Sequence, residues 1–128
     1  MGDPSSTESQ FKGKSGLRRV LNALQYSLAG LRAAYCHEQA FRQEVWLAAP
    51  LVVVASLFPV DALGKALLIG SILLVLIVEL MNSSIEAAVD YISMERHPLA
   101  KRAKDIGSAA VFVALVDVVV VWWLVLTR

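Results

Sequence analysis

Residues 17–36 carry apolar side chains at intervals of three and four positions. The apolar set is Leu17, Val20, Leu21, Leu24, Leu28, Leu31 and Tyr35. At about 100° per residue, these positions form one stripe along a helix, and mostly arginine, asparagine and glutamine lie opposite it. A basic amphipathic helix of this kind is typical of a segment that lies in the membrane interface. We therefore expect an interfacial helix over residues 17–36, preceded by a polar, mobile tail over residues 1–16.

Three longer stretches, residues 45–60, 66–78 and 106–127, contain a single charged residue, Asp117. A helix needs about 20 residues to cross a membrane. The second stretch reaches that length only if Glu79 lies inside the span, and the third only if Asp117 does. We predict three helical spans, at about residues 40–58, 62–92 and 99–126, because lipid satisfies no backbone hydrogen bonds. The expected fold is therefore an all-α membrane protein.

Composition and charge agree with a membrane location. Hydrophobic residues make up 57% of the 128 residues and charged residues only 18%, which argues against a disordered chain or a nucleic-acid-binding protein. Lysine and arginine gather before the first span and in the second loop (Arg96, Lys101, Arg102, Lys104), whereas the first loop has Lys65 and the C-terminus Arg128. This asymmetry predicts a cytoplasmic N-terminus and a periplasmic C-terminus.

The second span carries a polar stripe. Glu79, Asn82, Ser83, Glu86 and Asp90 fall on one narrow face of a helix that is otherwise apolar. An ionised carboxylate in a bilayer costs at least about 2.5–3.5 kcal/mol, so a pair of glutamates requires a cation, a proton or water. Hydrogen-bonded contact between helices would explain the asparagine and serine but not the glutamates. A cation pathway and a phosphoryl-transfer site both remain open.

The residues around the stripe favour a phosphate-bearing ligand. Lys104 and Asp105 lie near the start of the third span, and Arg18, Arg19 and Arg32 lie on the interfacial helix with Glu38 just after it. Attraction to anionic lipid is an alternative explanation for each single arginine. The chain has neither a GxxxxGK[ST] motif nor a glycine-rich kinase loop, so phosphoryl transfer here requires an unconventional site.

Four strings of residues are similar to those of a known family. They are YSLAGLRAA (26–34), HEQAFRQE (37–44), IVELMNSSIEAAVD (77–90) and RAKDIGSAA (102–110). In this order they resemble the bacterial integral-membrane diacylglycerol kinases, over the chain from about Leu17 to its end. The resemblance implies a homotrimer in the bacterial inner membrane, with active sites shared between neighbouring chains. The implied reaction transfers the γ-phosphoryl group of MgATP to diacylglycerol and produces phosphatidate.

The resemblance also implies roles for individual residues. Glu79 resembles the catalytic base and Asn82 the polar residue beside it, while Glu38 and Glu86 resemble carboxylates that bind Mg²⁺ and meet the nucleotide phosphates. The other implied nucleotide contacts are Arg19, Tyr26, Glu95, Arg96, His97, Lys104 and Asp105. The residues implied at the lipid substrate are Arg19, Arg32, Arg42, Glu44, Glu79 and Ser108.

Two alternative functions follow from the same sequence. Gram-positive relatives in this family phosphorylate undecaprenol, so the lipid acceptor is open between undecaprenol and diacylglycerol. A non-enzymatic small membrane subunit or cation pathway, built on the stripe from Glu79 to Asp90, is the alternative from another class. It predicts no Mg²⁺-dependent transfer of phosphate to lipid.

Overall fold

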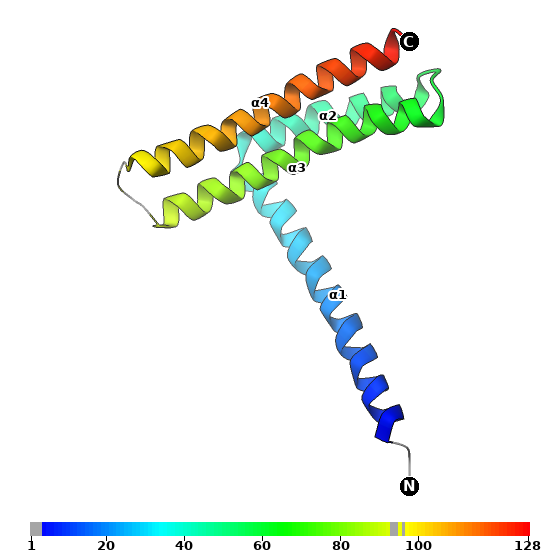
Figure 1. Cartoon of the computed structure of the whole chain (residues 1–128), viewed down its shortest axis with the longest axis vertical. Coiled ribbons are helices and arrows are strands. Elements are labelled where there is room, and N and C mark those ends of the chain that lie inside the picture. Colours follow the sequence, from blue (N-terminus) through cyan, green and yellow to red (C-terminus); the bar gives the residue numbers. More distant parts are fainter. Residues whose placement is uncertain (1–3, 93–94, 96) are drawn as a thin grey trace.

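The protein is all-helical, as the sequence predicts. The structure, a computed structural model, describes residues 4–92, 95 and 97–128, and the side chains from Ser15 onward within those ranges. This part of the chain forms α1 (Pro4–His37), α2 (Gln39–Leu57), α3 (Ala62–Ile92) and α4 (Pro98–Leu126). Helices α2, α3 and α4 lie side by side as a bundle, and α1 leaves the bundle at a steep angle (Figure 1). If the bundle crosses a membrane, this angle directs α1 along the membrane surface.

Helix α1 is longer than the sequence suggests. We expected a tail over residues 1–16 and a helix from Leu17, but the helix begins at Pro4. Proline suits the first position of a helix because its fixed backbone angle is already helical and it needs no amide hydrogen there. No further proline interrupts this helix. The polar segment before Leu17 therefore continues the helix, because polar residues do not by themselves end one. The expected boundary was wrong, whereas the mobility of the segment stays a prediction.

Helices α2, α3 and α4 are each long and apolar enough to span a membrane. They contain 19, 31 and 29 residues. At about 1.5 Å per residue, α3 is about 46 Å long, well beyond a hydrocarbon core of about 30 Å. Figure 1 shows the extra length of α3 and α4 extending past the α1–α2 junction. We call this end of the bundle, where α3 ends at Ile92 and α4 begins at Pro98, the elbow end.

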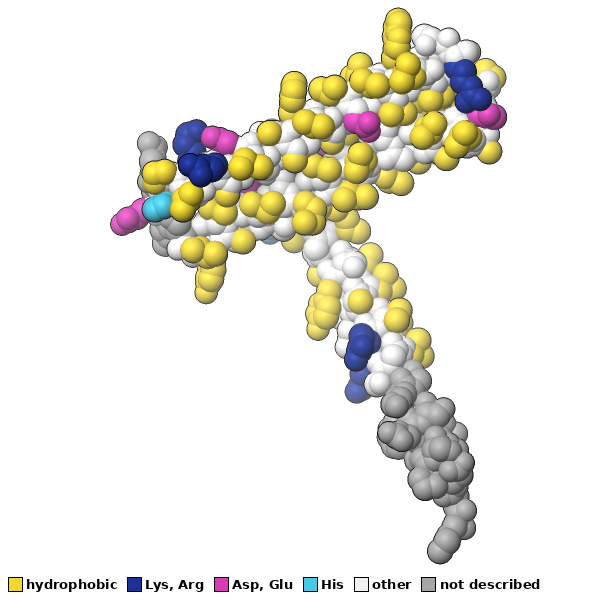
Figure 2. Space-filling view, viewed as in Figure 1, with side chains coloured by type: hydrophobic (Ala, Val, Ile, Leu, Met, Phe, Trp, Pro, Cys, Tyr) yellow, Lys and Arg dark blue, Asp and Glu magenta, His cyan; other side chains and the backbone are white. Residues whose placement is uncertain are grey.

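The bundle has a small core and a large apolar outer surface. The core cluster consists of Ala55, Leu68 and Val125, and Val60, Ile69, Val121 and Trp122 pack against it. Large apolar side chains cover the outside of the bundle (Figure 2). So much exposed apolar surface is unfavourable in water. A bilayer is the solvent that makes this arrangement stable.

The helix that follows each chain reversal begins with a side-chain N-cap. Asp61 caps α3, because the Gly64 amide donates a hydrogen bond to Asp61 Oδ1 at 2.8 Å. At the elbow end, Pro98 begins α4 and His97 is its N-cap. The Leu99 amide donates to His97 Nδ1 at 3.1 Å. These caps satisfy amide groups that a helix N-terminus otherwise leaves without partners.

Candidate active site

The polar stripe of α3 runs from the interior of the bundle to its elbow end. Glu79, Asn82 and Ser83 are buried, with exposed fractions of 5%, 8% and 8%. Glu86 is half-buried and Asp90 is exposed. The stripe therefore joins a buried carboxylate to the polar surface by way of a second one, as the helical spacing predicts.

A second glutamate, from α2, lies against the buried end of the stripe. The carboxyl groups of Glu44 and Glu79 are close enough to interact directly, and Glu86 and Glu38 are within electrostatic reach of Glu79. Glu44 Oε2 is buried and has no hydrogen-bond partner among the described residues. Because ionised carboxylates repel at short range, the Glu44–Glu79 pair requires a proton or a cation.

Asn82 is held between α3 and α4. Its Nδ2 donates to Glu86 Oε1 at 3.4 Å, and its buried Oδ1 has no hydrogen-bond partner in the part of the chain that the structure describes. That oxygen occupies the space that a Cβ atom on Gly107 would fill. A larger residue than glycine at this point of α4 would displace the Asn82 amide, since the helices approach closely here. The sequence did not lead us to Gly107. A single glycine inside an apolar helix was the signal that could have indicated a close helix contact there.

Two ion pairs order the elbow end. Lys104 Nζ lies 2.5 Å from Asp90 Oδ1 and ties α4 to α3, and Lys101 Nζ lies 2.6 Å from Asp105 Oδ2 within α4. The sequence suggested Lys104 and Asp105 as neighbouring nucleotide contacts. In the structure each of them is paired with a different residue, and of these two pairs the one between Lys104 and Asp90 links the stripe to α4.

The structure separates the other expected site residues. Arg19, Tyr26 and Arg32 are exposed on α1, and the basic side chains that Figure 2 shows on α1 lie well away from the bundle. Ser108 is exposed on α4 and Glu95 is exposed in the α3–α4 connection, while Arg96 lies outside the described residues. The fold of one chain therefore gathers the glutamates and Asn82 but not the residues of α1.

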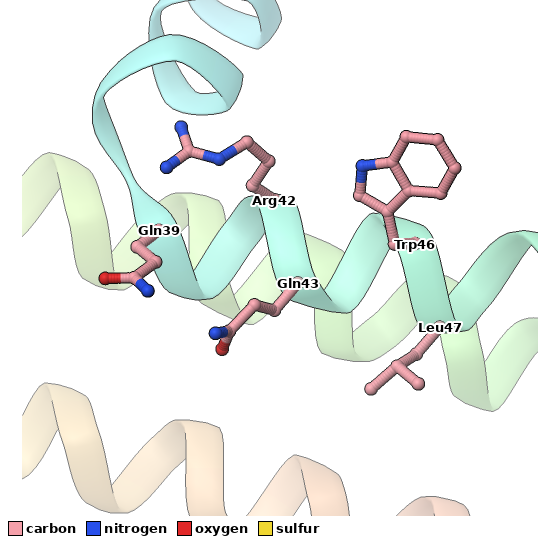
Figure 3. A pocket seen from close by; sticks show the side chains of 5 residues that line it. All are labelled: Gln39, Arg42, Gln43, Trp46 and Leu47. Atoms are coloured by element: carbon pink, nitrogen blue, oxygen red, sulfur yellow. The ribbon is translucent and has the colours of Figure 1, made fainter.

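Arg42 has backbone partners at the junction of α1 and α2. Its Nη1 donates to the carbonyl oxygens of Tyr35 at 2.7 Å and Cys36 at 3.2 Å. Figure 3 shows Arg42 above a shallow groove of about 490 Å³ whose other lining residues are Gln39, Gln43, Trp46 and Leu47. Arg42 was expected at the lipid substrate, and here it also completes the C-terminal end of α1.

A cleft lies between α1 and α3. Its volume is about 650 Å³, and Leu31, Ala34, Leu80 and Ala87 contribute apolar walls. Glu38 also lines it. A mostly apolar cleft with an acidic edge suits an amphipathic molecule better than a small polar one.

Comparison with known proteins decides the family. Residues 25–126 match the family described as prokaryotic diacylglycerol kinase. The chain belongs to this family. A diacylglycerol kinase of Pseudomonas aeruginosa is 58% identical over 114 residues, which cover 89% of this chain and 93% of the relative. Those of Escherichia coli K12 and Haemophilus influenzae are 49% and 45% identical, over 88% and 84% of this chain and 92% of each relative.

Membership of the prokaryotic diacylglycerol kinase family makes the chain a multi-pass bacterial membrane protein and an enzyme of the lipid kinase class. It gives no support to a non-enzymatic subunit or cation pathway. The three relatives carry the name diacylglycerol kinase, so the undecaprenol alternative gains nothing from them either.

Kinases of this family transfer phosphoryl groups, which generally requires a divalent metal. Within the described residues, no group of three or more His, Cys, Asp or Glu side chains is arranged to hold a metal ion. Mg²⁺ usually takes only one or two protein carboxylates and completes its shell with phosphates and water. The donor set around Glu79, with its unpartnered buried oxygens, fits that kind of site.

Proposed function

We propose that the chain is an ATP-dependent diacylglycerol kinase. It transfers the γ-phosphoryl group of ATP to the free hydroxyl of 1,2-diacylglycerol and yields phosphatidate and ADP. The observation that carries this proposal is the group of carboxylates around Glu79, in a chain of this family. Glu38, one of these carboxylates, lines an apolar cleft, so a lipid hydroxyl and a metal-bound nucleotide can meet there.

Glu79 is the proposed catalytic base. As the lipid hydroxyl oxygen attacks the γ-phosphorus, the bond from that phosphorus to the β–γ bridging oxygen breaks and ADP leaves. The hydroxyl proton passes to the Glu79 carboxylate. A base helps because an alcohol is a weak nucleophile. Burial of Glu79 and its contact with Glu44 support this role, and Asn82 holds the neighbouring carboxylate of Glu86.

Glu38 and Glu86 are the proposed Mg²⁺ ligands. Glu38 joins α1 to α2, and Glu86 lies about two turns beyond Glu79 on α3. When bound, the metal neutralises charge on the β- and γ-phosphates. The two glutamates hold the nucleotide between the base and the polar elbow end.

The nucleotide lies, in this proposal, over the elbow end of α3 and α4. Lys104 supplies a cation for phosphate there, and Asp105, Glu95 and His97 lie in or near the α3–α4 connection. Arg96, outside the described residues, is the remaining nucleotide contact proposed in this segment. Half-exposure of Lys104, and its pairing with Asp90, support a cation held in place before ATP arrives.

A shared site in a homotrimer accounts for the residues of α1. In one chain Arg19, Tyr26 and Arg32 are exposed, so a neighbouring chain is the natural recipient of their contacts. We place the N-terminus and the elbow end on the cytoplasmic side of the bacterial inner membrane and the C-terminus on the periplasmic side. Lysine and arginine gather in the N-terminal segment and near the α3–α4 connection, and such residues are enriched in cytoplasmic segments. Ser108, like Glu44, belongs to the proposed lipid side of the site.

A mixed-micelle assay with labelled ATP and Mg²⁺ tests the function. Diacylglycerol and undecaprenol are supplied in parallel, and we expect transfer to diacylglycerol. Glu79→Gln should lower turnover at least about a hundredfold, which is the scale of general-base catalysis. Asp117→Asn is the matched control, because Asp117 is a half-buried carboxylate on α4 outside the site. Transfer to undecaprenol alone, or full activity of Glu79→Gln, would refute the assignment.

A further inference from the structure

The α1–α2 elbow is unusually short. Helix α1 ends at His37 and α2 begins at Gln39, so Glu38 alone makes the turn. Its backbone is extended (φ −108°, ψ 106°), and its side chain makes no hydrogen bond to cap α2. Any change in the direction of α1 therefore moves Glu38 directly, because no loop lies between them to absorb it.

The C-terminal end of α1 is closed by Arg42. A helix leaves its last carbonyl groups without intrahelical partners, and the helix dipole makes them favourable acceptors for a cation. The Glu38 amide donates to the Ala34 carbonyl at 2.8 Å. Arg42 Nη1 donates to the next two carbonyl oxygens, those of Tyr35 and Cys36. Arg42 lies on α2, so these bonds join the end of one helix to the first turn of the next.

A second link spans the elbow one turn further along α2. Trp46 Nε1 donates to the Tyr35 hydroxyl at 3.0 Å, and Trp46 follows Arg42 by four residues on the same helical face. Both residues border the groove in Figure 3. Tyrosine and tryptophan favour the membrane interface, where one end of each ring is apolar and the other is polar. Tyr35 is thus held by Arg42 through its carbonyl and by Trp46 through its hydroxyl.

We propose that Arg42, Tyr35 and Trp46 form an elbow clamp that sets the direction of α1 and thereby places Glu38 for metal binding. In this proposal Arg42 is a positioning residue and does not bind the lipid. If the clamp fails its test, the expected role of Arg42 at the lipid is the alternative. The inference rests on the proposed role of Glu38, and it adds two residues, Tyr35 and Trp46, that the family resemblance does not assign. Positioning partners of metal ligands typically change metal affinity by about 10- to 100-fold when removed.

The first test measures geometry without metal or substrate. Spin labels at Leu24→Cys on α1 and Leu73→Cys on α3, both exposed positions, are introduced into a Cys36→Ser background in nanodiscs. Labelled chains are diluted with unlabelled chains so that only distances within one chain are measured. We expect a narrow distance distribution that broadens in Arg42→Gln.

The conservative variants Tyr35→Phe and Trp46→Phe each remove one partner of the same hydrogen bond. Each should broaden the distribution less than Arg42→Gln, and the double variant should match the single ones because the bond is lost only once. Gln43→Ala is the matched control, since Gln43 borders the same groove and is not part of the clamp. It should leave the distribution unchanged.

The second test separates metal binding from lipid binding in the full chain. In Arg42→Gln the Mg²⁺ concentration for half-maximal activity should rise about tenfold, while the KM for diacylglycerol stays the same. An unchanged distance distribution, or a raised lipid KM with an unchanged Mg²⁺ requirement, would overturn the clamp. If the wild-type chain transfers no phosphate, the proposed function fails, but the distance measurements still decide whether the clamp exists.

Discussion

Gly107 offers the sharpest test of how α3 and α4 position the site. In Gly107→Ala, the new methyl group would occupy the space of Asn82 Oδ1, so the amide must rotate or the helices must separate. Rotation breaks the contact from Asn82 Nδ2 to Glu86 Oε1, which is 3.4 Å long in the structure. The change therefore reaches a proposed metal ligand without altering any charged group.

The expected magnitudes come from two opposing effects on stability and one on rate. Alanine is favoured over glycine in a helix by about 1 kcal/mol, whereas overpacking costs about 1–3 kcal/mol. The net loss of stability should thus be no more than about 2 kcal/mol. A misplacement of about 1 Å at a reacting centre can lower the rate about a hundredfold. We expect kcat to fall about 10- to 100-fold in a protein that still folds.

Gly70→Ala is the matched control for this substitution. Gly70 also lies inside a spanning helix, α3, but a Cβ atom there would meet no atom within 4 Å. This variant should keep its activity and unfold no more readily than the wild type. The assays are kinase activity in mixed micelles and thermal unfolding in detergent followed by circular dichroism. A fully active Gly107→Ala would refute the proposed packing of α4 against Asn82.

Two further substitutions test other parts of the structure. Asp90→Asn removes the exposed pair with Lys104, so it should leave the unfolding free energy almost unchanged, because solvent screens exposed ion pairs. It should also lower turnover less than Glu79→Gln does; equal losses of turnover would show that the exposed end of the stripe takes part in the chemistry. Asp61→Ala removes the N-cap of α3 and should destabilise the protein in thermal unfolding by about 1 kcal/mol. Arg128→Ala removes only the exposed, 3.6 Å pair with Asp61 and should have little effect, so equal destabilisation would contradict the capping role.

Much of the fold follows from the order of residues alone. Apolar stretches of spanning length predict three helices with nearly the bounds of α2, α3 and α4, because helix periodicity and bilayer thickness are local constraints. The stripe from Glu79 to Asp90 is predictable for the same reason, since residues three and four apart share one face of a helix. The start of α1 was not predictable, because a polar segment without a second proline is compatible with either helix or coil.

What only the tertiary structure decided is which faces of different helices meet. The contact of Glu44 with Glu79, the fit of Asn82 against Gly107 and the closure of α1 by Arg42 all join residues from separate helices. Sequence periodicity says which residues share a face, but not which face turns toward which neighbour. In a bilayer, apolar side chains are equally stable against lipid or protein, so close packing at small residues and polar contacts set that orientation. These are properties of helix pairs, and no single helix contains them.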